Sequence, residues 1–364
     1  MLSKYSITVL VCLGCYFIGF LLYSLKHGFP KDSPKLPSML NLDFLRIFFT
    51  LAIVFHHFIN KLKIWNAAYF SVEFFFILSG FLLVLSFRPE RKTSDFMLNR
   101  WIRFTPLVLF GGLLSSLFYS EVKAHYFIEN VFLVSSDLPA LTRTLYNNPD
   151  WYIFVLFWAS TLLFYALKYF KKAGINVLAA FIIVAGTIYS VHYGNGEVHG
   201  IISARIVRGF TCLGLGYFLA EIYAQLKDHT ILHQKLFNLL ELGVFLFALL
   251  SLFVRPLYQG TIVVYISFMA LILLFALRKG AVSAFFNKPI FSKLSKYCLA
   301  IYLTHWFLVA NIFPIFLKKY NGFLTSHRII PLIVIPVLAC LVGFVAHHAV
   351  ELPATKFLKK HLEK

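Results

Sequence analysis

The sequence predicts an all-α fold, a polytopic bundle of about eleven transmembrane helices. Hydrophobic residues make up 60% of the 364 positions and charged residues only 13%, an apolar content far above that of a soluble domain. Eleven apolar stretches are long enough to cross the ~30 Å hydrocarbon core as helices. Because the lysines and arginines gather in alternate loops, the net charge of +19 indicates membrane topology and not nucleic-acid binding.

The first apolar stretch, residues 5–25, is expected to be an uncleaved span. It is longer than the apolar region of a signal peptide, and no small-x-small cleavage motif is evident before Lys26. We therefore assign residues 1–37 to an extra N-terminal span with its linker and residues 38–360 to the main membrane domain. The ten further spans are expected at 42–60, 71–87, 104–120, 151–169, 175–193, 205–226, 236–254, 260–277, 297–317 and 329–350. The apolar segment 126–134 is too short to span and is interpreted as re-entrant or interfacial.

The loops between these spans indicate an orientation. One alternate set holds 22 lysines and arginines and the opposite set about 9. The basic set comprises residues 26–41, 88–103, 168–174, 227–235, 278–296 and 351–364. The positive-inside rule predicts a cytoplasmic C-terminus in the cell inner membrane, with the N-terminus outside. No loop exceeds about 30 residues, so any chemistry is expected within the bundle or at its mouths.

The cysteines are interpreted as small buried apolar residues, because each lies in an apolar run without zinc-ligand spacing around it. They are Cys12, Cys15, Cys212, Cys298 and Cys340. No thioredoxin-like βαβ pattern surrounds the first two, so no redox motif is predicted. No metal site is predicted either.

The stretch "LRIFFTLAIVFHHF", residues 45–58, places charged and titratable groups at bilayer depth. Such groups cost at least ~2.5 to 3.5 kcal/mol there, which favours a functional interpretation. Arg46 and His57 are eleven positions apart, about 1100° on an α-helix, so they lie within about 20° of one face and ~16 Å apart. His56 lies about 80° away, and packing or an interhelical hydrogen bond explains it. Snorkelling to headgroups is the alternative for Arg46.

The next apolar stretch, "SVEFFFILSGFLL", returns antiparallel through the membrane. Glu73 is therefore expected near the outer end, at the depth of His57, where a carboxylate could orient the imidazole of a general base. A helix-capping role at the N-terminus is the alternative for Glu73. Ser79 and Gly80 lie deeper and would let a helix or ligand approach closely.

Three further stretches carry polar residues. "NRWIRFTP" places Arg100 and Arg103 before the fourth span, as a phosphate clamp or as a positive-inside anchor. "ARIVRGFTCLGLGYF" carries Arg208 near the outer end of its span. "YLTHWF" places His305 about 12 Å from the cytoplasmic face, too deep to snorkel. His305 and Arg208 are candidates for additional polar residues of the core.

Four pieces, in order, make the chain resemble the acyltransferase family 3 of integral-membrane proteins. They are the Arg-to-His spacing in "RIFFTLAIVFHH", the segment "SVEFFFILSGFLL", the pair of arginines before proline in "NRWIRFTP", and the closing "YLTHW" with "VELPATKFLKK". The resemblance covers about residues 38–360. It implies a family core of ten helices, to which residues 5–25 add one.

The resemblance implies transfer of an acyl group, usually acetyl, from acyl-CoA to hydroxyls of surface carbohydrates. The donor would come from the cytoplasm and the acceptor, possibly lipid-linked, from the outer side; no bound cofactor is expected. The implied catalytic residues are His57 as base, Arg46 and Glu73, and the implied donor-binding residues are Arg100, Arg103 and Ser79. Many family members have Ser-x-Glu after the position of Trp151, whereas this chain has no acid in "WYIFVLFW".

Two other functions stay open. A transporter or flippase of lipid-linked sugars would use the same buried charges as a substrate or proton pathway, and it predicts inverted repeats with broken helices, which are not visible. A purely structural subunit predicts that apolar replacements of the buried charges are tolerated. The acceptor, the oligomeric state and the formation of a covalent acyl-histidine stay undetermined.

Overall fold

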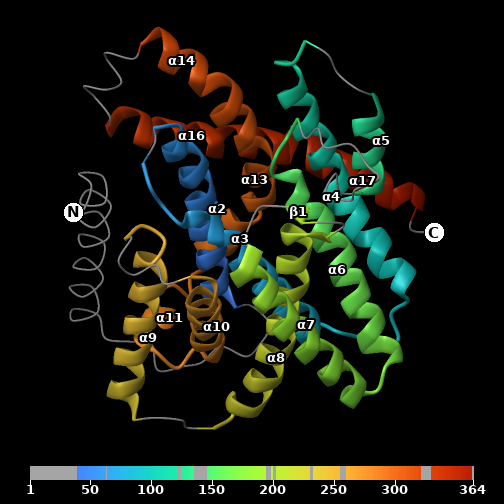
Figure 1. Cartoon of the computed structure of the whole chain (residues 1–364), viewed down its shortest axis with the longest axis vertical. Helices are drawn as coiled ribbons and strands as arrows, with labels where there is room; N and C mark the ends of the chain where they lie inside the picture. Colours follow the sequence, from blue (N-terminus) through green and yellow to red (C-terminus); the bar gives the residue numbers. More distant parts are fainter. Residues whose placement is uncertain are drawn as a thin grey trace.

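The computed structural model describes residues 39–62, 64–120, 124–134, 146–193, 198–199, 202–229, 233–254, 260–320 and 329–362. This part of the chain is a bundle of helices (Figure 1). Its only strands form a hairpin of two residues each, β1 (Val198–His199) and β2 (Ile202–Ser203). The predicted all-α class is therefore confirmed.

Nearly every predicted span corresponds to a helix within a few residues. The first half of the bundle contains α2 (Leu40–Lys61), η1 (Ala68–Phe70), α3 (Ser71–Leu85), α4 (Thr93–Ser116), α5 (Ala124–Phe132), α6 (Asp150–Tyr169) and α7 (Lys172–Tyr193). The second half contains α8 (Ala204–Leu226), α9 (Gln234–Leu250), α10 (Thr261–Leu277), α11 (Ala281–Phe285), α12 (Pro289–Ser295), α13 (Cys298–Trp306), η3 (Phe307–Ile312), α14 (Phe313–Lys319), α16 (Ile329–Ala346), η4 (His347–Glu351) and α17 (Leu352–Leu362).

Seven helical segments of the described chain are long and apolar enough to span a membrane, which makes this a multi-pass membrane protein. They are Leu40–Lys61, Ala68–Leu85, Asp150–Tyr169, Lys172–Tyr193, Ala204–Leu226, Pro289–Lys319 and Ile330–Leu362. The apolar helix α10 is shorter, at 17 residues. The total of eleven spans stays a prediction, and the predicted span 5–25 lies outside the described residues.

Helix α4 begins at Thr93, well before the predicted start at 104. Arg100 and Arg103 therefore lie inside the helix and not in the loop before it. The prediction was wrong because apolar content alone defined the span, whereas a helix continues through charged residues that have good helix propensity.

The segment predicted to be re-entrant or interfacial contains the short helix α5. Two tryptophans from neighbouring helices hold its C-terminal end. The indole N–H of Trp101 donates to the Val131 carbonyl at 2.6 Å, and that of Trp158 donates to the Leu133 carbonyl at 2.8 Å. These bonds satisfy carbonyls that a helix end leaves without intrahelical partners.

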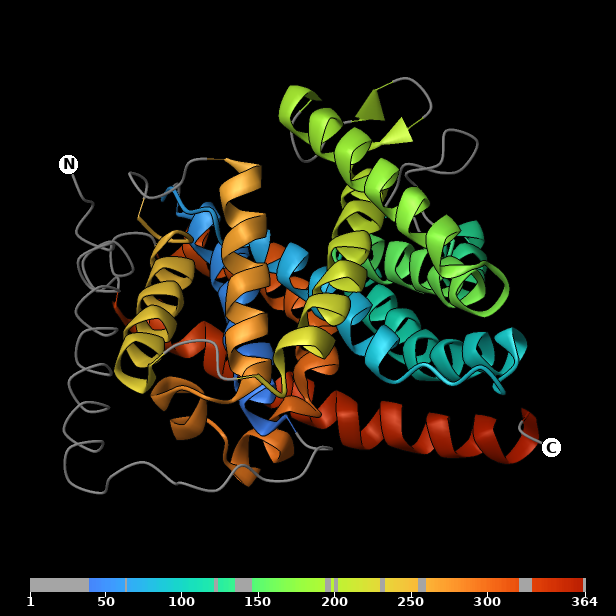
Figure 2. The same cartoon turned by 90° about the horizontal axis from the view of Figure 1, so that it is seen from below.

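Two long helical segments each contain a π-helical turn. The first passes from α13 through η3 into α14, and the second from α16 through η4 into α17. Figures 1 and 2 show the second as a long rod that crosses one side of the bundle. Such turns are rare and frequently lie at functional sites. The first directly follows His305 and Trp306, so it determines how the chain leaves them.

Helices α3 and α8 pack backbone against backbone at two glycines. A Cβ added at Gly216 would lie 2.9 Å from the Cα of Gly80 and 2.7 Å from the amide nitrogen of Phe81. A Cβ added at Gly80 would lie 3.1 Å from the Leu213 Cα. Small residues at membrane helix interfaces allow this close approach, so the glycine contact determines the register of α3 against α8.

We expect Gly216→Ala to lower the stability of the protein by about 1 to 3 kcal/mol, because the new methyl group meets backbone atoms that cannot rotate away. Gly243→Ala in α9 is the matched control, since nothing lies within 4 Å of a Cβ at that position. The control should be neutral or slightly stabilising. Thermal unfolding of the detergent-solubilised variants measures both effects, and equal midpoints for the two would contradict the packing argument.

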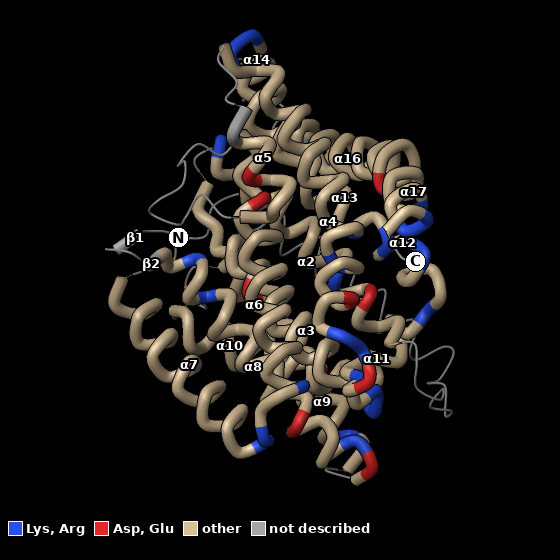
Figure 3. Tube along the Cα trace, turned by 90° about the vertical axis from the view of Figure 1, so that its right-hand side faces the viewer, with Lys and Arg blue, Asp and Glu red and all other residues tan. Residues whose placement is uncertain are grey.

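Contacts between loops agree with the alternation predicted from charge. Lys168 donates to the Arg91 carbonyl at 2.7 Å, and Lys279 donates to the His229 carbonyl. Each bond joins two loops of the basic set. Figure 3 shows further lysines and arginines along the side of the bundle where α11, α12 and α17 lie.

Candidate active site

His57 lies near the C-terminal end of α2 and is held between two side chains of α13. Its ring centroid lies 5.3 Å from that of His305, with planes 26° apart, and 5.0 Å from that of Trp306, with planes 87° apart. His305 is fully buried, whereas His57 is partly exposed. Lys61, one turn further along α2, lies over the Trp306 ring at 6.0 Å. A partly exposed imidazole with a restrained ring suits the role of a general base.

His56 points to different partners, as the helical angle predicts. Its Nδ1 lies 2.6 Å from the Asn66 side-chain oxygen, and its Nε2 lies 3.1 Å from the Asn60 amide nitrogen. Asn66 also bonds to Asn60 at 3.2 Å. Because both ring nitrogens are engaged, this histidine is part of a structural hydrogen-bond network.

Glu73 does not orient His57, contrary to the prediction. Its Oε1 accepts from Nε of Arg208 at 2.6 Å and pairs with Nη2 at 2.5 Å, and the pair is almost completely buried. Both residues lie about two turns before the glycine contact on their helices, so the parallel packing of α3 and α8 brings them together. The Arg208 guanidinium also lies 5.5 Å from the Trp151 ring. The additional polar core predicted at Arg208 thus has Glu73 as its counter-ion.

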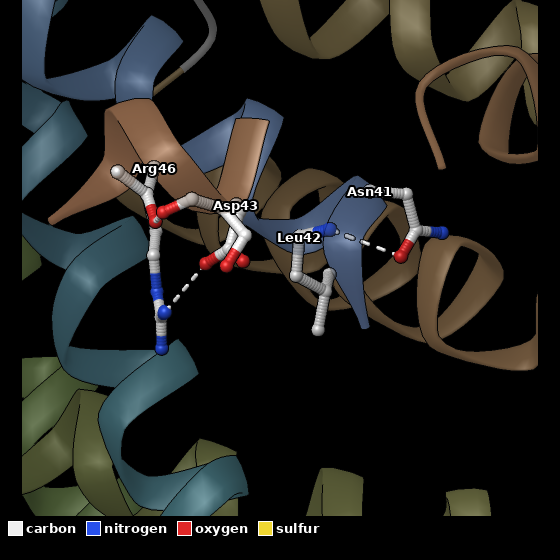
Figure 4. A network of polar contacts seen from close by, with 6 residues as sticks. Asn41, Leu42, Asp43 and Arg46 are labelled. Carbon is white, nitrogen blue, oxygen red and sulfur yellow. Dashed lines mark hydrogen bonds and ion pairs between the residues drawn. The ribbon is translucent and has the colours of Figure 1, made fainter. Parts of the chain in front are cut away.

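Arg46 lies near the opposite end of α2 from His57. Its Nη1 forms an ion pair with Asp43 at 2.7 Å, and its side chain is 37% exposed. Figure 4 shows this pair, with the Arg46 side chain extended toward the ribbon of α4. Asp43 lies in the first turn of α2, where a carboxylate suits the helix dipole. Their i, i+3 spacing places the two side chains next to each other on the helix surface.

Arg100, Arg103 and Arg46 lie close enough to the Tyr152 phenol for the charges of all three guanidinium groups to act on it, and Ser79 interacts with the same phenol. Arg100 lies over the Phe96 ring at 4.8 Å. Within the described ranges, neither Arg100 nor Arg103 forms an ion pair with a carboxylate. The residues predicted to bind the donor therefore do lie together, with positive charge that is not fully balanced.

A column of four aromatic rings joins the arginine cluster to His57. The centroid separations are 5.3 Å from Tyr152 to Tyr302, 5.9 Å from Tyr302 to His305 and 5.3 Å from His305 to His57. The Tyr302 hydroxyl donates to the Pro149 carbonyl at 3.1 Å. The rings of this column belong to α6, α13 and α2, and they lie between the arginine cluster and His57.

A buried network at the start of α6 was not among the features predicted from the sequence. The Asp150 carboxylate accepts from the Tyr126 hydroxyl at 2.7 Å and from the Asn147 amide at 2.7 Å. Burial, together with Asp150, raises the pKa of Tyr126. The Asn147 amide also donates to the Leu303 carbonyl at 2.9 Å, which ties α13 to α6. An acid just before Trp151, at a helix start, was the available signal.

Comparison with known protein families gives one match. A family described as an acyltransferase domain matches residues 39–348, which is most of the chain. The match contains both ends of α2, the arginines of α4 and the His305 segment. No curated protein and no solved structure matches the chain.

Proposed function

Because the chain belongs to the acyltransferase family 3, we propose that it is an O-acyltransferase that moves an acyl group, acetyl by preference, from acyl-CoA to a carbohydrate hydroxyl. The single observation that carries the proposal is the arrangement along α2, with a partly exposed, ring-restrained His57 at one end and an arginine cluster beside the other. Donor recognition, by Arg46 together with Arg100 and Arg103 of α4, and proton transfer, by His57, are thus assigned to opposite ends of α2.

In the proposed reaction, His57 takes the proton of the acceptor hydroxyl as the oxygen attacks the thioester carbonyl carbon. A carbon–oxygen bond forms and the carbon–sulfur bond breaks. The imidazolium then returns the proton to the departing CoA thiolate, so the enzyme ends unchanged. Glu73 acts in this scheme through its pairing with Arg208, which holds α3 against α8.

We assign the arginine cluster to the phosphates of the donor. Guanidinium groups form bidentate, charge-assisted bonds with phosphate, and the charges of Arg100, Arg103 and Arg46 all act on the Tyr152 phenol. The concentration of lysine and arginine in the basic set of loops supports a cytoplasmic donor and C-terminus, in the inner membrane. The acceptor, possibly lipid-linked, would then approach His57 from the outer side.

Acyl transfer to carbohydrate is tested directly in proteoliposomes. Vesicles that contain the purified protein are supplied with [14C]acetyl-CoA on one side and with lipid-linked or polysaccharide acceptors on the other. We expect label in the carbohydrate that mild alkali releases, as for an ester. Sugar movement without label transfer would identify a transporter or flippase and refute the proposal.

Arg100→Ala and Arg103→Ala are each expected to raise KM for acetyl-CoA by about 10- to 100-fold with a smaller change in kcat, because a charge-assisted bond contributes about 1.5 to 3 kcal/mol. Exposed Arg88→Ala is the matched control and should leave KM unchanged. A truncated donor, the acetyl thioester of pantetheine, lacks the phosphates. With it, wild type and both variants should have the same KM, and a retained difference would exclude phosphate recognition.

A further inference from the structure

The side chains whose charge acts on His57 are all bases, namely His305, His56 and Lys61. Among the described residues, no carboxylate forms an ion pair with His57 or with Lys61. Glu73, the acid predicted to lie beside His57, is paired with an arginine elsewhere. When His57 takes a proton, it therefore becomes a second full cation close to Lys61, and no described carboxylate balances the two.

The C-terminal end of α2 supplies only part of the missing negative charge. A helix C-terminus carries about half an elementary negative charge, and its effect falls off within the last turn. Lys61 lies in that turn, so the ammonium group already shares the helix dipole with His57. A protonated His57 beside Lys61 therefore calls for a further negative charge, brought by a molecule that binds at this end of the helix.

Lys61 is placed to contact such a molecule together with His57. Its side chain is exposed, and its ammonium group lies over the half-buried Trp306 ring at 6.0 Å. The His57 ring lies 5.0 Å from the same ring, so the ammonium group and the imidazole are at most about 11 Å apart. His57 and Lys61 are also four residues apart, which places them on one face of α2. One bound acceptor can therefore contact both side chains.

The position of Lys61 in the membrane also favours a role in binding. The predicted orientation places this lysine at the outer end of α2, on the side whose loops hold about 9 lysines and arginines against 22 on the other side. The positive-inside rule concentrates basic residues on the cytoplasmic side. Membrane topology thus gives no reason for a cation beside the base, whereas an anionic substrate does.

We propose that the acceptor carries an anionic group, a carboxylate or a phosphate, close to the hydroxyl that is acylated, and that Lys61 binds this group. The inference rests on the proposed function of His57 as base and adds the class of the acceptor. The bound anion pairs with the ammonium group and offsets its repulsion of the imidazolium that forms at His57. Acidic polysaccharides offer carboxylates, and lipid-linked sugars offer the phosphate of the linkage.

Chemical modification of the acceptor tests the proposal and distinguishes these two sources. Proteoliposomes made of neutral lipid, so that no anionic headgroup competes for Lys61, are supplied with radiolabelled acetyl-CoA and with carbohydrate extracted from the cells that make the protein. Label should enter material that an anion-exchange column retains. One portion of the carbohydrate is treated to reduce carboxylates to alcohols, and another to remove phosphate. The treatment that removes the recognised anion should raise KM by about 10- to 100-fold. An unchanged KM after both treatments would overturn the proposal.

Two variants of Lys61 separate its charge from its packing. Lys61→Met keeps an apolar stem over Trp306 and should raise KM for the untreated carbohydrate by about 10- to 100-fold, whereas Lys61→Arg keeps the charge and should stay within a few-fold of wild type. Lys319→Met is the matched control, because Lys319 is also exposed and also lies over a ring, that of Tyr320, at 5.4 Å. Equal effects of the two Lys61 variants, or an effect of Lys61→Met no larger than that of the control, would contradict the assignment.

The variant and the treated carbohydrate together form a double cycle. With carbohydrate that has lost its anion, wild type and Lys61→Met should have the same KM, because the group that Lys61 binds is gone. A retained difference would indicate that Lys61 acts through packing or through the membrane, and it would overturn the inference. Failure of the wild-type protein to label any carbohydrate would instead refute the proposed function, so the two failures are distinguishable.

Discussion

Replacement of His57 by alanine is expected to lower the rate of acyl transfer by at least about 10²- to 10⁴-fold, the range typical for loss of a general base. The affinity for acetyl-CoA should change little, because the arginines assigned to the donor lie at the other end of α2. Acyl transfer is measured in proteoliposomes and donor binding by equilibrium methods in detergent. A change in affinity with an unchanged rate would contradict the role of His57 as base.

The neighbouring His56 provides a matched control for this experiment. His56→Ala removes an imidazole one residue away and leaves Asn66 without its ring partner. That change is expected to lower stability by about 1 to 3 kcal/mol, while the folded protein keeps its rate of acyl transfer. Equal losses of rate in the two variants would indicate that the end of α2 matters only for packing.

The second large effect concerns the buried pair of Glu73 and Arg208. Arg208→Met leaves the Glu73 carboxylate buried without its counter-ion, so we expect a loss of about 3 to 5 kcal/mol of stability. Glu73→Leu should cost a similar amount by leaving the guanidinium unpaired. Thermal unfolding in detergent, or yield of folded protein from membranes, measures the loss.

Combining both substitutions tests whether the cost arises from the unpaired charge. The double variant has no buried charge at this point, and its side chains fill a similar volume, so much of the lost stability should return. Additive destabilisation in the double variant would show that the two residues contribute separately, through packing with Trp151 or other neighbours.

The helices and the arrangement along α2 were predictable because they depend on the length of each apolar stretch and on the constant turn of an α-helix per residue. Apolar length predicted most spans, and 100° per residue placed His57 and His56 on different faces of one helix. The proximity of the α4 arginines to Arg46 was predictable, since the spans that contain them were expected to begin on the same side of the membrane.

The partner of Glu73 was not predictable from local pattern. It depends on which helix packs beside α3 and in which register, and the contact of Gly80 with Gly216 determines both. Judged by depth in the membrane alone, His57 was as suitable a partner for Glu73 as Arg208. The network of Asp150 was missed for a related reason, because it includes Tyr126 of α5 and, through Asn147, a carbonyl of α13, both distant in the sequence.

Helix α2 contains neither glycine nor proline between Leu40 and Lys61 and runs without interruption. It is therefore a continuous helix that holds Arg46 and His57 at a fixed separation of ~16 Å along its axis. A donor whose phosphates are bound near Arg46 must extend along the helix for its acyl group to reach His57, because the helix cannot shorten. If the proposed acyl-CoA donor binds in this way, the chain length between its phosphates and its acyl carbon would limit which thioesters the protein accepts.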